Sequence, residues 1–151
     1  MEYQTLIELL LDKGLELNDK VAFRYLSNGE PDGKSESITY IELLKRAQTI
    51  GESLSKLGAT NKNALIIYPS GLSFIEAFFG AIFAGATPIP IQSIGLNNAK
   101  LFNAQFKQII NNAKVEFVLG AKEIQDKLER FDEYSAKLTW IDSSQIKNSL
   151  V

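Results

Sequence analysis

The sequence contains neither cysteine nor histidine. Without cysteine the fold can use no disulfide and no thiolate metal site, which is typical of proteins in a reducing cytosol, so we expect a cytoplasmic protein. Without histidine the commonest general base and the commonest metal ligand are both missing. Chemistry carried out by this chain alone is therefore restricted to carboxylates, lysine, tyrosine and backbone groups.

Concentrated charge is missing as well. The net charge of −2 is spread along the chain, with no basic block or stripe. Because neutralising phosphates requires clustered Lys and Arg, we expect no nucleic-acid partner and no attachment to an anionic membrane surface. Glu2 and Glu8 stand where a signal peptide would carry positive charge, so no targeting segment is predicted. With 45% hydrophobic and 23% charged residues, the 151-residue chain has the composition of one soluble, compact domain.

A long hydrophobic run is absent too. The most apolar passage, FFGAIFAGATPIPI at 78–91, offers only 11 residues between the preceding glutamate and its first proline, whereas a bilayer-spanning helix needs about 20. We therefore expect no transmembrane segment. The passage instead predicts a buried helix that starts near Phe74 behind a Ser73–Glu76 capping box, ends at Gly85 and leads into a buried strand.

Hydrophobic periodicity organises the rest of the chain. Thr5 with Glu8, and Thr39 with Glu42, have the spacing of capping boxes at two further helix starts. The turn-rich sequence NGEPDGK between two strand-like runs predicts a β-hairpin. The predicted order is helix 6–13, strands 21–27 and 35–40, a helix with Leu43, Ala47, Ile50, Leu54 and Leu57 on its apolar face, strand 64–68, helix 74–85, strand 87–92, helix 102–113, strand 115–120, helix 122–135 and strand 137–142. Because strand and helix alternate from residue 64, we predict an α/β fold with a mostly parallel sheet flanked by helices and an N-terminal β-hairpin.

Several places have the residue types of a functional site, and each also has a structural interpretation. The turn at 69–71, Pro-Ser-Gly, follows a strand, where α/β proteins often bind phosphate, but with one glycine and no nearby lysine it is predicted to be a tight turn. Asp142 ends a strand, as the acceptor of a phospho-receiver domain would; without an acidic cluster the prediction is a solvated strand end. Trp140 and Tyr68 are expected to pack in the core. Three acids that alternate with basic residues on one predicted helix indicate a solvated face: Glu129, Asp132 and Glu133.

Three passages, in this order, resemble the start of the adenylate-forming (acyl-activating, AMP-binding) enzyme superfamily. The first runs from AFRYLSNGE through the TYIEL helix to Gly58-Ala59, the second is ALIIYPSGLSFIEAFFGAIFAGATPIPI, and the third is VEFVLG with the helix before it. Within the superfamily, FRYLSNGE and PSGLSFIEAFFG look most like fatty acyl-AMP ligases. Acyl-CoA synthetases share much of this element, and the proline-rich segment usual in the ligases is absent after residue 91, so both subfamilies stay open.

The resemblance implies what an intact enzyme of this kind does. It would join a fatty acid carboxylate to the α-phosphate of ATP with the help of Mg²⁺, and pass the acyl group from acyl-AMP to an acyl carrier protein. The family's phosphate loop, adenine motif, ribose-binding aspartate and C-terminal lysine have no counterpart in this sequence. We therefore expect residues 1–151 to be an incomplete N-terminal segment of an AMP-binding domain, inactive without the remainder of the adenylation domain, which binds no cofactor by itself.

No residue is accordingly assigned a catalytic, cofactor-binding or metal-binding role, and the substrate-binding residues stay unidentified. Two alternative interpretations stay open. One is a stand-alone α/β interaction module that reuses the same core, and the other is a segment of an acyl-CoA synthetase.

Overall fold

A four-stranded parallel sheet forms the centre of the structure, a computed structural model that describes residues 2–27, 29, 33–69, 71–91, 99–128 and 138–148. β3 (Asn63–Ile67) lies between β4 (Thr87–Pro90) and β5 (Val115–Gly120), and β6 (Thr139–Ile141) continues the sheet beyond β5. The two inner strands consist largely of branched apolar residues, as expected for strands that are covered on both faces.

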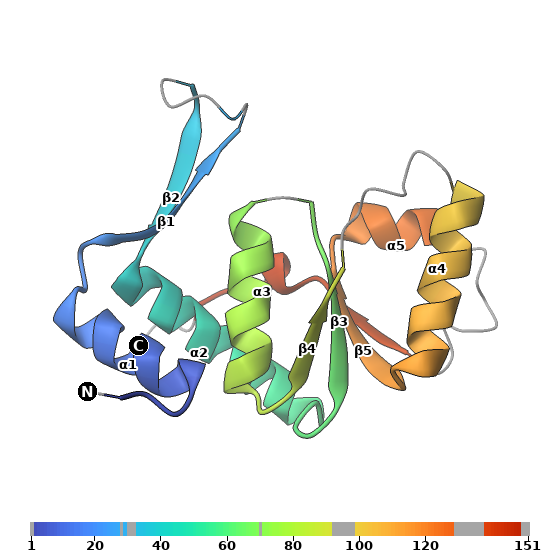
Figure 1. Cartoon of the computed structure of the whole chain (residues 1–151), viewed down its shortest axis with the longest axis horizontal. Coiled ribbons are helices and arrows are strands. Elements are labelled where there is room, and N and C mark those ends of the chain that lie inside the picture. Colours follow the sequence, from blue (N-terminus) through green and yellow to red (C-terminus); the bar gives the residue numbers. More distant parts are fainter. Residues whose placement is uncertain are drawn as a thin grey trace.

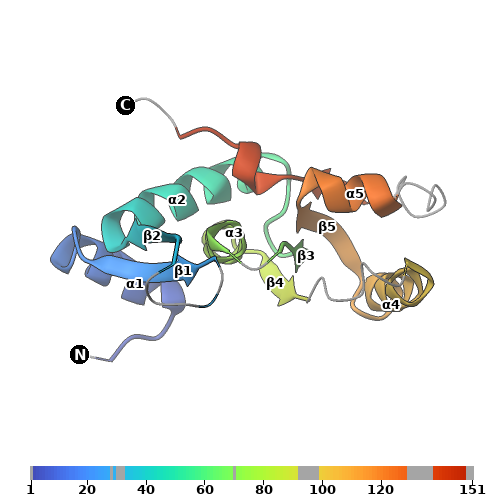
Figure 2. The same ribbon diagram turned by 90° about the horizontal axis from the view of Figure 1, so that it is seen from above.

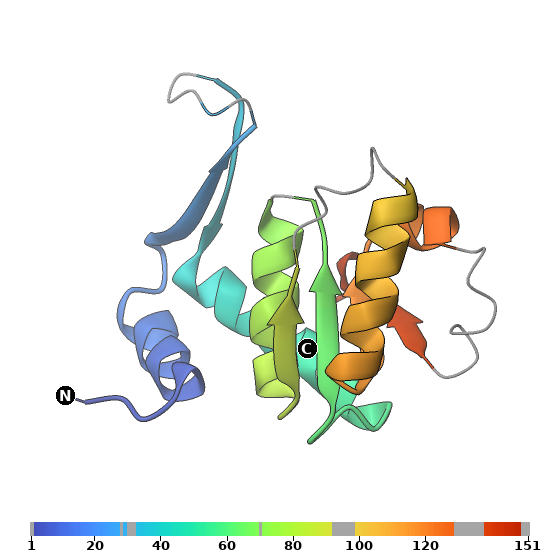
Figure 3. The ribbon, with the colours of Figure 1, turned by 45° about the vertical axis from the view of Figure 1, so that its right-hand side comes forward.

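Helices cover both faces of the sheet, as Figures 2 and 3 show. On one face lie α2 (Tyr40–Lys56) and α3 (Leu72–Phe83); on the other lies α4 (Ala99–Asn112). The core on the first face includes Ile50, Leu54, Ile66, Ala77, Ala81 and Leu119. The core on the second face includes Leu65, Ile67, Phe106, Ile110, Val118 and, from α5 (Lys122–Leu128), Ile124. The result is a three-layer α/β unit, which confirms the predicted fold class.

The helices α2 and α3 approach each other closely at two glycines. A Cβ added at Gly51 would lie 2.7 Å from the Cβ of Phe83, and one added at Gly80 would lie 2.7 Å from the Cβ of Ile50. Real Cβ atoms do not come this close, so the two helices meet where a side chain is missing. Gly51 and Gly80 therefore allow the close packing of the two helices.

The N-terminal part consists of α1 (Leu6–Glu16) and a hairpin formed by β1 (Val21–Leu26) and β2 (Ser35–Thr39). The hairpin extends away from the rest of the chain (Figure 1). At its base a third apolar cluster joins α1, β2 and α2 through Leu10, Ile38, Leu43, Leu44 and Ala47. The predicted hairpin is thus confirmed, and this cluster attaches it to the three-layer unit.

The outer edge of β4 is built differently from the inner strands. Thr87 and Ile91 donate their N–H groups toward β3, to the carbonyl oxygens of Lys62, the residue before the strand (2.9 Å), and of Ile66 (3.0 Å). Because backbone N–H groups alternate in direction along a strand, the nitrogens at positions 88 and 90 face the free side. Both positions are proline and carry no N–H, so this edge lacks the donors that would pair with another strand.

Two of the three predicted capping boxes differ from the structure. At α2 the box is complete, because Thr39 Oγ1 accepts from Glu42 N–H and the Glu42 carboxylate accepts from Thr39 N–H. At α1 Thr5 caps the helix, but the Glu8 carboxylate accepts from Gln4 N–H instead. At α3 the prediction is wrong: the helix begins at Leu72 behind Gly71, without a side-chain cap.

Other predictions differ in detail. Leu57, predicted on the apolar face of α2, follows the helix end and is 56% exposed. Helix α1 continues to Glu16, three residues beyond its predicted end. The prediction of a solvated face at Glu129, Asp132 and Glu133 lies outside the described residues. None of the helices in the described part of the chain is long and apolar enough to cross a bilayer.

Candidate functional site

The strand order creates one topological switch point. From β3 the chain crosses to β4 on one side and then returns past β3 to β5 on the other side. In open parallel sheets, ligands bind in the crevice at the carboxyl ends of the strands where connections diverge in this way. Residues 68–71 follow β3, and residues 121–122 follow β5. This end of the sheet is therefore the candidate location of a functional site.

The connection after β3 contains Pro69 and Gly71, two of the three residues of the predicted turn. Gly71 precedes α3 with a φ of 150°, in the region that favours glycine, while a Cβ there would meet no atom within 4 Å. The backbone conformation and not crowding thus requires the glycine. Pro69 has no N–H to offer a phosphate, and the middle residue of the turn lies outside the described residues. The absence of a phosphate site here stays a prediction.

Tyr68 ties the ends of two strands together. Its hydroxyl donates to Asp142 Oδ1 (3.0 Å), accepts from the Ser143 N–H (2.7 Å) and lies 2.9 Å from Ser143 Oγ. Tyr68 and Ser143 are both buried. Burial raises the pKa of the Tyr68 hydroxyl well above its ordinary value, and the charge of Asp142 raises it further. The hydroxyl is therefore a fixed structural donor and not a general base, which agrees with the predicted core position.

Asp142 is more firmly engaged than the predicted solvated strand end. Besides the Tyr68 hydroxyl, its carboxylate accepts from the N–H of Lys122 (3.3 Å), the N–H of Ser144 (3.1 Å) and the hydroxyl of Ser144 (2.5 Å). It thereby caps a 3₁₀ turn, η2 (Ser143–Gln145). Asp142 stays partly exposed, but the sequence prediction missed these hydrogen bonds because sequence alone does not bring Tyr68 to the end of β6. Over the described ranges no three acidic residues form a group that could hold a metal ion, so the phospho-receiver alternative gains no support.

Trp140 lies where the sequence predicts it. Its indole N–H donates to the carbonyl oxygen of Gly120 (3.0 Å), and its ring centroid is 6.4 Å from that of Phe106. The side chain packs against the core between the sheet and α4. These contacts are those of a packing residue.

Arg46 is the residue that the sequence reasoning missed. Its guanidinium donates to the carbonyl oxygens of Ser143 (2.7 Å) and Ile146 and to Asn148 Oδ1 (3.1 Å), and its Nε lies 3.6 Å from Glu76 Oε2. The side chains of Arg46 and Glu76 are only 11% and 20% exposed. Burial raises the pKa of Glu76, and the positive charge of Arg46 opposes this shift.

A sequence signal for Arg46 did exist. It stands three residues after Leu43 and four before Ile50, which places a charged residue on the apolar face of α2. Glu76 likewise lies within the most apolar helix of the chain. Two opposite charges at positions expected to be buried indicate an ion pair between the two helices.

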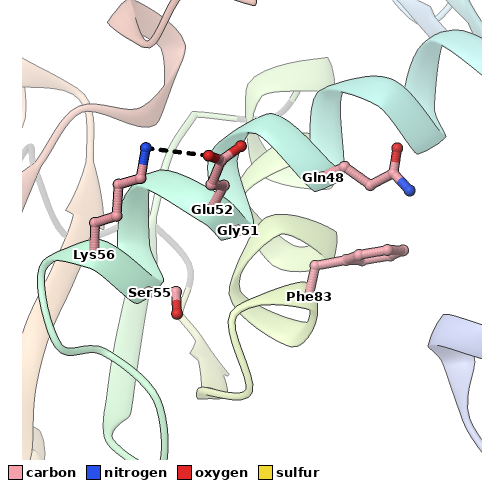
Figure 4. A pocket seen from close by; sticks show the side chains of 6 residues that line it. All are labelled: Gln48, Gly51, Glu52, Ser55, Lys56 and Phe83. Carbon is pink, nitrogen blue, oxygen red and sulfur yellow. Dashed lines mark ion pairs between the residues drawn. The ribbon is translucent and has the colours of Figure 1, made fainter. Parts of the chain in front are cut away.

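Hollows on the described surface include two that border α3. Figure 4 shows the first, about 530 Å³ between α2 and α3, where Gln48, Gly51, Ser55 and Phe83 accompany an exposed ion pair of Lys56 with Glu52 (3.1 Å). Such a pair on a helix surface is solvated and contributes little. The second, about 280 Å³, lies between α1, the hairpin and α3 and is lined mainly by Leu6, Leu9, Leu10, Phe23, Leu43 and Phe79. Neither hollow combines a nucleophile, an acid–base pair and an oxyanion donor.

The described residues at the carboxyl end of the sheet do not offer a site that fits ATP with Mg²⁺. The turn after β3 has one glycine and no lysine, and the carboxylate of Asp142 is occupied by four protein donors. A nucleotide site needs converging N–H groups, a cation and oxygen ligands for the metal. The described donors and the carboxylate at this end of the sheet instead bond to one another.

Comparison with known proteins places this architecture in a family. Residues 13–149 match the family described as AMP-binding enzyme. The chain is 29% identical, over 99% of its own length and 26% of the relative's, to the medium-chain fatty acid–[acyl-carrier-protein] ligase JamA of Moorena producens. It is 30% identical, over 56% of its length and 15% of the relative's, to the long-chain fatty acid–AMP ligase FadD26 of Mycobacterium tuberculosis.

A solved structure agrees with the sequence relatives. The fatty acid AMP ligase of Legionella pneumophila superposes with a TM-score of 0.79 and 25% identity, over 97% of this chain and 24% of that one. The chain thus spans about a quarter of the length of these two proteins with which it aligns almost completely. The hairpin, the three-layer unit and the TYIEL and AGATPIPI passages all lie inside the matched range. This chain belongs to the AMP-binding enzyme family, the adenylate-forming enzymes.

Proposed function

We propose that residues 1–151 are the leading segment of the adenylation domain of a fatty acid-activating ligase. The complete enzyme joins a fatty acid to ATP and forms acyl-AMP and pyrophosphate with Mg²⁺. This segment supplies the leading part of the domain, and the residues that bind ATP and Mg²⁺ belong to the remainder. By itself the segment forms no acyl-AMP.

One observation carries the proposal: the family match covers 13–149, yet the chain corresponds to about a quarter of the fatty acid ligases that it resembles over nearly its whole length. The chemistry of the described residues supports the same division. Adenylation develops negative charge on phosphate oxygens, which a cation and fixed N–H donors must stabilise. At the carboxyl end of the sheet, the hydroxyl of Tyr68, the carboxylate of Asp142 and the neighbouring backbone N–H groups instead form hydrogen bonds with one another.

The proposed acceptor of the acyl group is an acyl carrier protein. The support is the relative from Moorena producens, whose name gives an acyl carrier protein as its partner. The FadD26 and Legionella pneumophila relatives are named as AMP ligases, and neither name includes coenzyme A. Coenzyme A is the alternative acceptor. With either acceptor we expect the enzyme to be in the cytoplasm.

The test compares the 151-residue chain with a longer protein that carries it at its start. Each is incubated with ATP, Mg²⁺ and fatty acids of medium and long chain, and acyl-AMP is measured by mass spectrometry alongside pyrophosphate release. We expect acyl-AMP from the longer protein and none from the chain alone. Acyl-AMP from the chain alone, or none from the longer protein with any fatty acid, overturns the proposal.

The acceptor is then decided by adding either a phosphopantetheinylated acyl carrier protein or coenzyme A to the longer protein. Loss of acyl-AMP with acylated carrier as product supports the ligase assignment. Acyl-CoA as the product supports the synthetase alternative. If the 151-residue chain is a stable monomer and no acyl-AMP forms either from it or from the longer protein, the stand-alone module is supported.

A further inference from the structure

The last described segment of the chain, residues 143–148, lies against α2 and α3, and Arg46 makes the connection. The guanidinium reaches the carbonyl oxygens of Ser143 and Ile146 and the side chain of Asn148, while its Nε faces Glu76. One side chain of α2 therefore contacts both α3 and three residues of the segment that follows β6.

Arginine is suited to this place for a chemical reason. The planar guanidinium presents five N–H donors in a fixed fork, so it can serve two carbonyls, an amide oxygen and a carboxylate at once. Its charge strengthens each hydrogen bond, because a charged donor binds a neutral acceptor more strongly than a neutral donor does. A lysine ammonium is a compact point charge and cannot span acceptors on three sides.

The surroundings favour a fixed geometry. The Arg46 side chain is 11% exposed, so solvent competes weakly for its donors. Ile146 packs against the core on the same face as α2 and α3, and Ser143 is fully buried and bonded to Tyr68. Arg46 and Tyr68 thus hold the segment from two sides.

We propose that Arg46 is a positioning residue that fixes the path of the chain after β6. Residues 143–148 are the last described residues, so their placement sets the direction in which the chain leaves the sheet. In the enzyme of the proposed function the segment that follows belongs to the remainder of the adenylation domain, and that consequence rests on the proposed function. The fixation itself does not.

Amide hydrogen exchange of the 151-residue chain tests the fixation directly. The N–H groups of Ser143, Ser144, Gln145 and Ile146 are all hydrogen-bonded, so their exchange reports whether the segment stays in place. We expect Arg46→Ala to speed exchange in 143–146 by about tenfold or more, from the loss of charge-assisted hydrogen bonds. Exchange in β3 and β5 should change far less.

Three further variants separate positioning from general stability. Arg46→Lys keeps the charge but not the fork, so it should restore only part of the protection. Asn148→Ala removes a single contact and should give a smaller local change, which keeps the proposal testable if Arg46→Ala does not fold. Lys56→Ala breaks the exposed ion pair on the same helix and should leave 143–146 unchanged. Equal exchange in Arg46→Ala and the unmodified chain, full restoration by lysine, or an equal loss of protection in β3 and β5 overturns the proposal.

The longer protein provides the functional arm. There Arg46→Ala should lower the rate of acyl-AMP formation at saturating substrates by about tenfold or more, with Arg46→Lys in between and Lys56→Ala unchanged. If exchange in 143–146 rises but this rate does not fall, the segment is fixed without consequence for catalysis and the positioning role is wrong. If the unmodified longer protein makes no acyl-AMP, the proposed function fails while the exchange experiment still decides the fixation.

Discussion

The central strands and the hairpin contain similar residues but differ in what covers them. In β3 four of five residues are buried, including Leu65, Ile66 and Ile67. In β1 Val21 is 43% exposed and Phe23 is 39% exposed. Branched and aromatic residues favour strands in both places, yet within the described residues only the central sheet has helices on both faces (Figure 2). Strand propensity therefore does not predict burial, and the neighbouring helices decide it.

The same difference appears in how the two regions are attached. An isolated two-stranded hairpin is marginal in water. Here β1 and β2 depend on the cluster around Ile38 and Leu43 at their base, whereas β3 and β5 pair with each other and with an outer strand each. The central sheet should therefore account for most of the free energy of unfolding. The hairpin should respond mainly to changes at its base.

The largest expected effect is on the free energy of unfolding, when one phenylalanine in each region is replaced by alanine. Phe117 in β5 is 6% exposed, and Phe117→Ala should lower the free energy of unfolding by about 3–5 kcal/mol because it leaves a cavity in the core. Phe23→Ala in β1 should cost clearly less, since part of that ring already contacts water. Urea denaturation followed by circular dichroism measures both. Similar losses in the two variants would mean that the hairpin is as well packed as the sheet.

A pair of tyrosines gives the next effect. Tyr68→Phe removes the hydroxyl that accepts from the buried Ser143 N–H, so this variant should lose about 1–3 kcal/mol. Tyr25→Phe on the half-exposed hairpin is the matched control and should stay within about 0.5 kcal/mol. The same denaturation experiment applies, and an unchanged Tyr68→Phe would show that the Ser143 N–H finds another acceptor.

Substitutions at the free edge of β4 should change self-association of the chain more than its free energy of unfolding. Replacing Pro88 and Pro90 by threonine restores two N–H donors on the outer side of the strand, so we expect the variant to self-associate at concentrations where the unmodified chain does not. Light scattering and size-exclusion chromatography measure this. Thr87→Val is the control, because the N–H of residue 87 already points to β3. An unchanged association state in the proline variant would mean that other features protect this edge.

The smallest expected effect is on the pH dependence of the free energy of unfolding, and it involves Glu76 on α3 and Glu36 on the hairpin. Burial raises the pKa of Glu76 in the folded state, and the charge of Glu36 on β2 adds to the rise. The folded state therefore binds this proton more tightly than the unfolded chain does. Stability from this group is full below the ordinary carboxyl pKa and is lost as the pH rises through the folded pKa.

Glu76→Gln should remove this part of the pH dependence, and Glu36→Gln should reduce it. The measurement is the free energy of unfolding by urea between about pH 4 and 8. Glu52→Gln, at an exposed carboxylate, is the control. If Glu76→Gln loses stability with rising pH just as the unmodified chain does, burial of Glu76 is not its cause.

The sequence predicts the architecture because each element carries a local signal. The 115–120 strand is found with its predicted bounds, and the Thr39–Glu42 capping box starts α2 as expected. The predicted start of α3 was wrong because the carboxylate of Glu76 has two possible partners. It could cap the helix, but in the structure it pairs with Arg46 on another helix instead. Local spacing cannot reveal a partner 30 positions away.

The candidate site was predicted less well for the same reason. Tyr68 and Asp142 are far apart in the sequence, and only the parallel pairing of β3, β5 and β6 brings their side chains together. Arg46 was overlooked because a single basic residue in a helix is usually solvated. The family resemblance, in contrast, depends on contiguous passages, so it could be recognised without the fold and is confirmed by the comparisons.

The contact of α2 with α3 at Gly51 and Gly80 limits how this protein can be engineered. Replacing helical glycines by alanine is a routine way to raise thermal stability, since alanine favours the helix by about 1 kcal/mol. At these two positions the added methyl group would force the helices apart, and the loss of packing would exceed the gain in helix propensity. A consensus or propensity-based redesign of this segment should therefore leave both positions untouched.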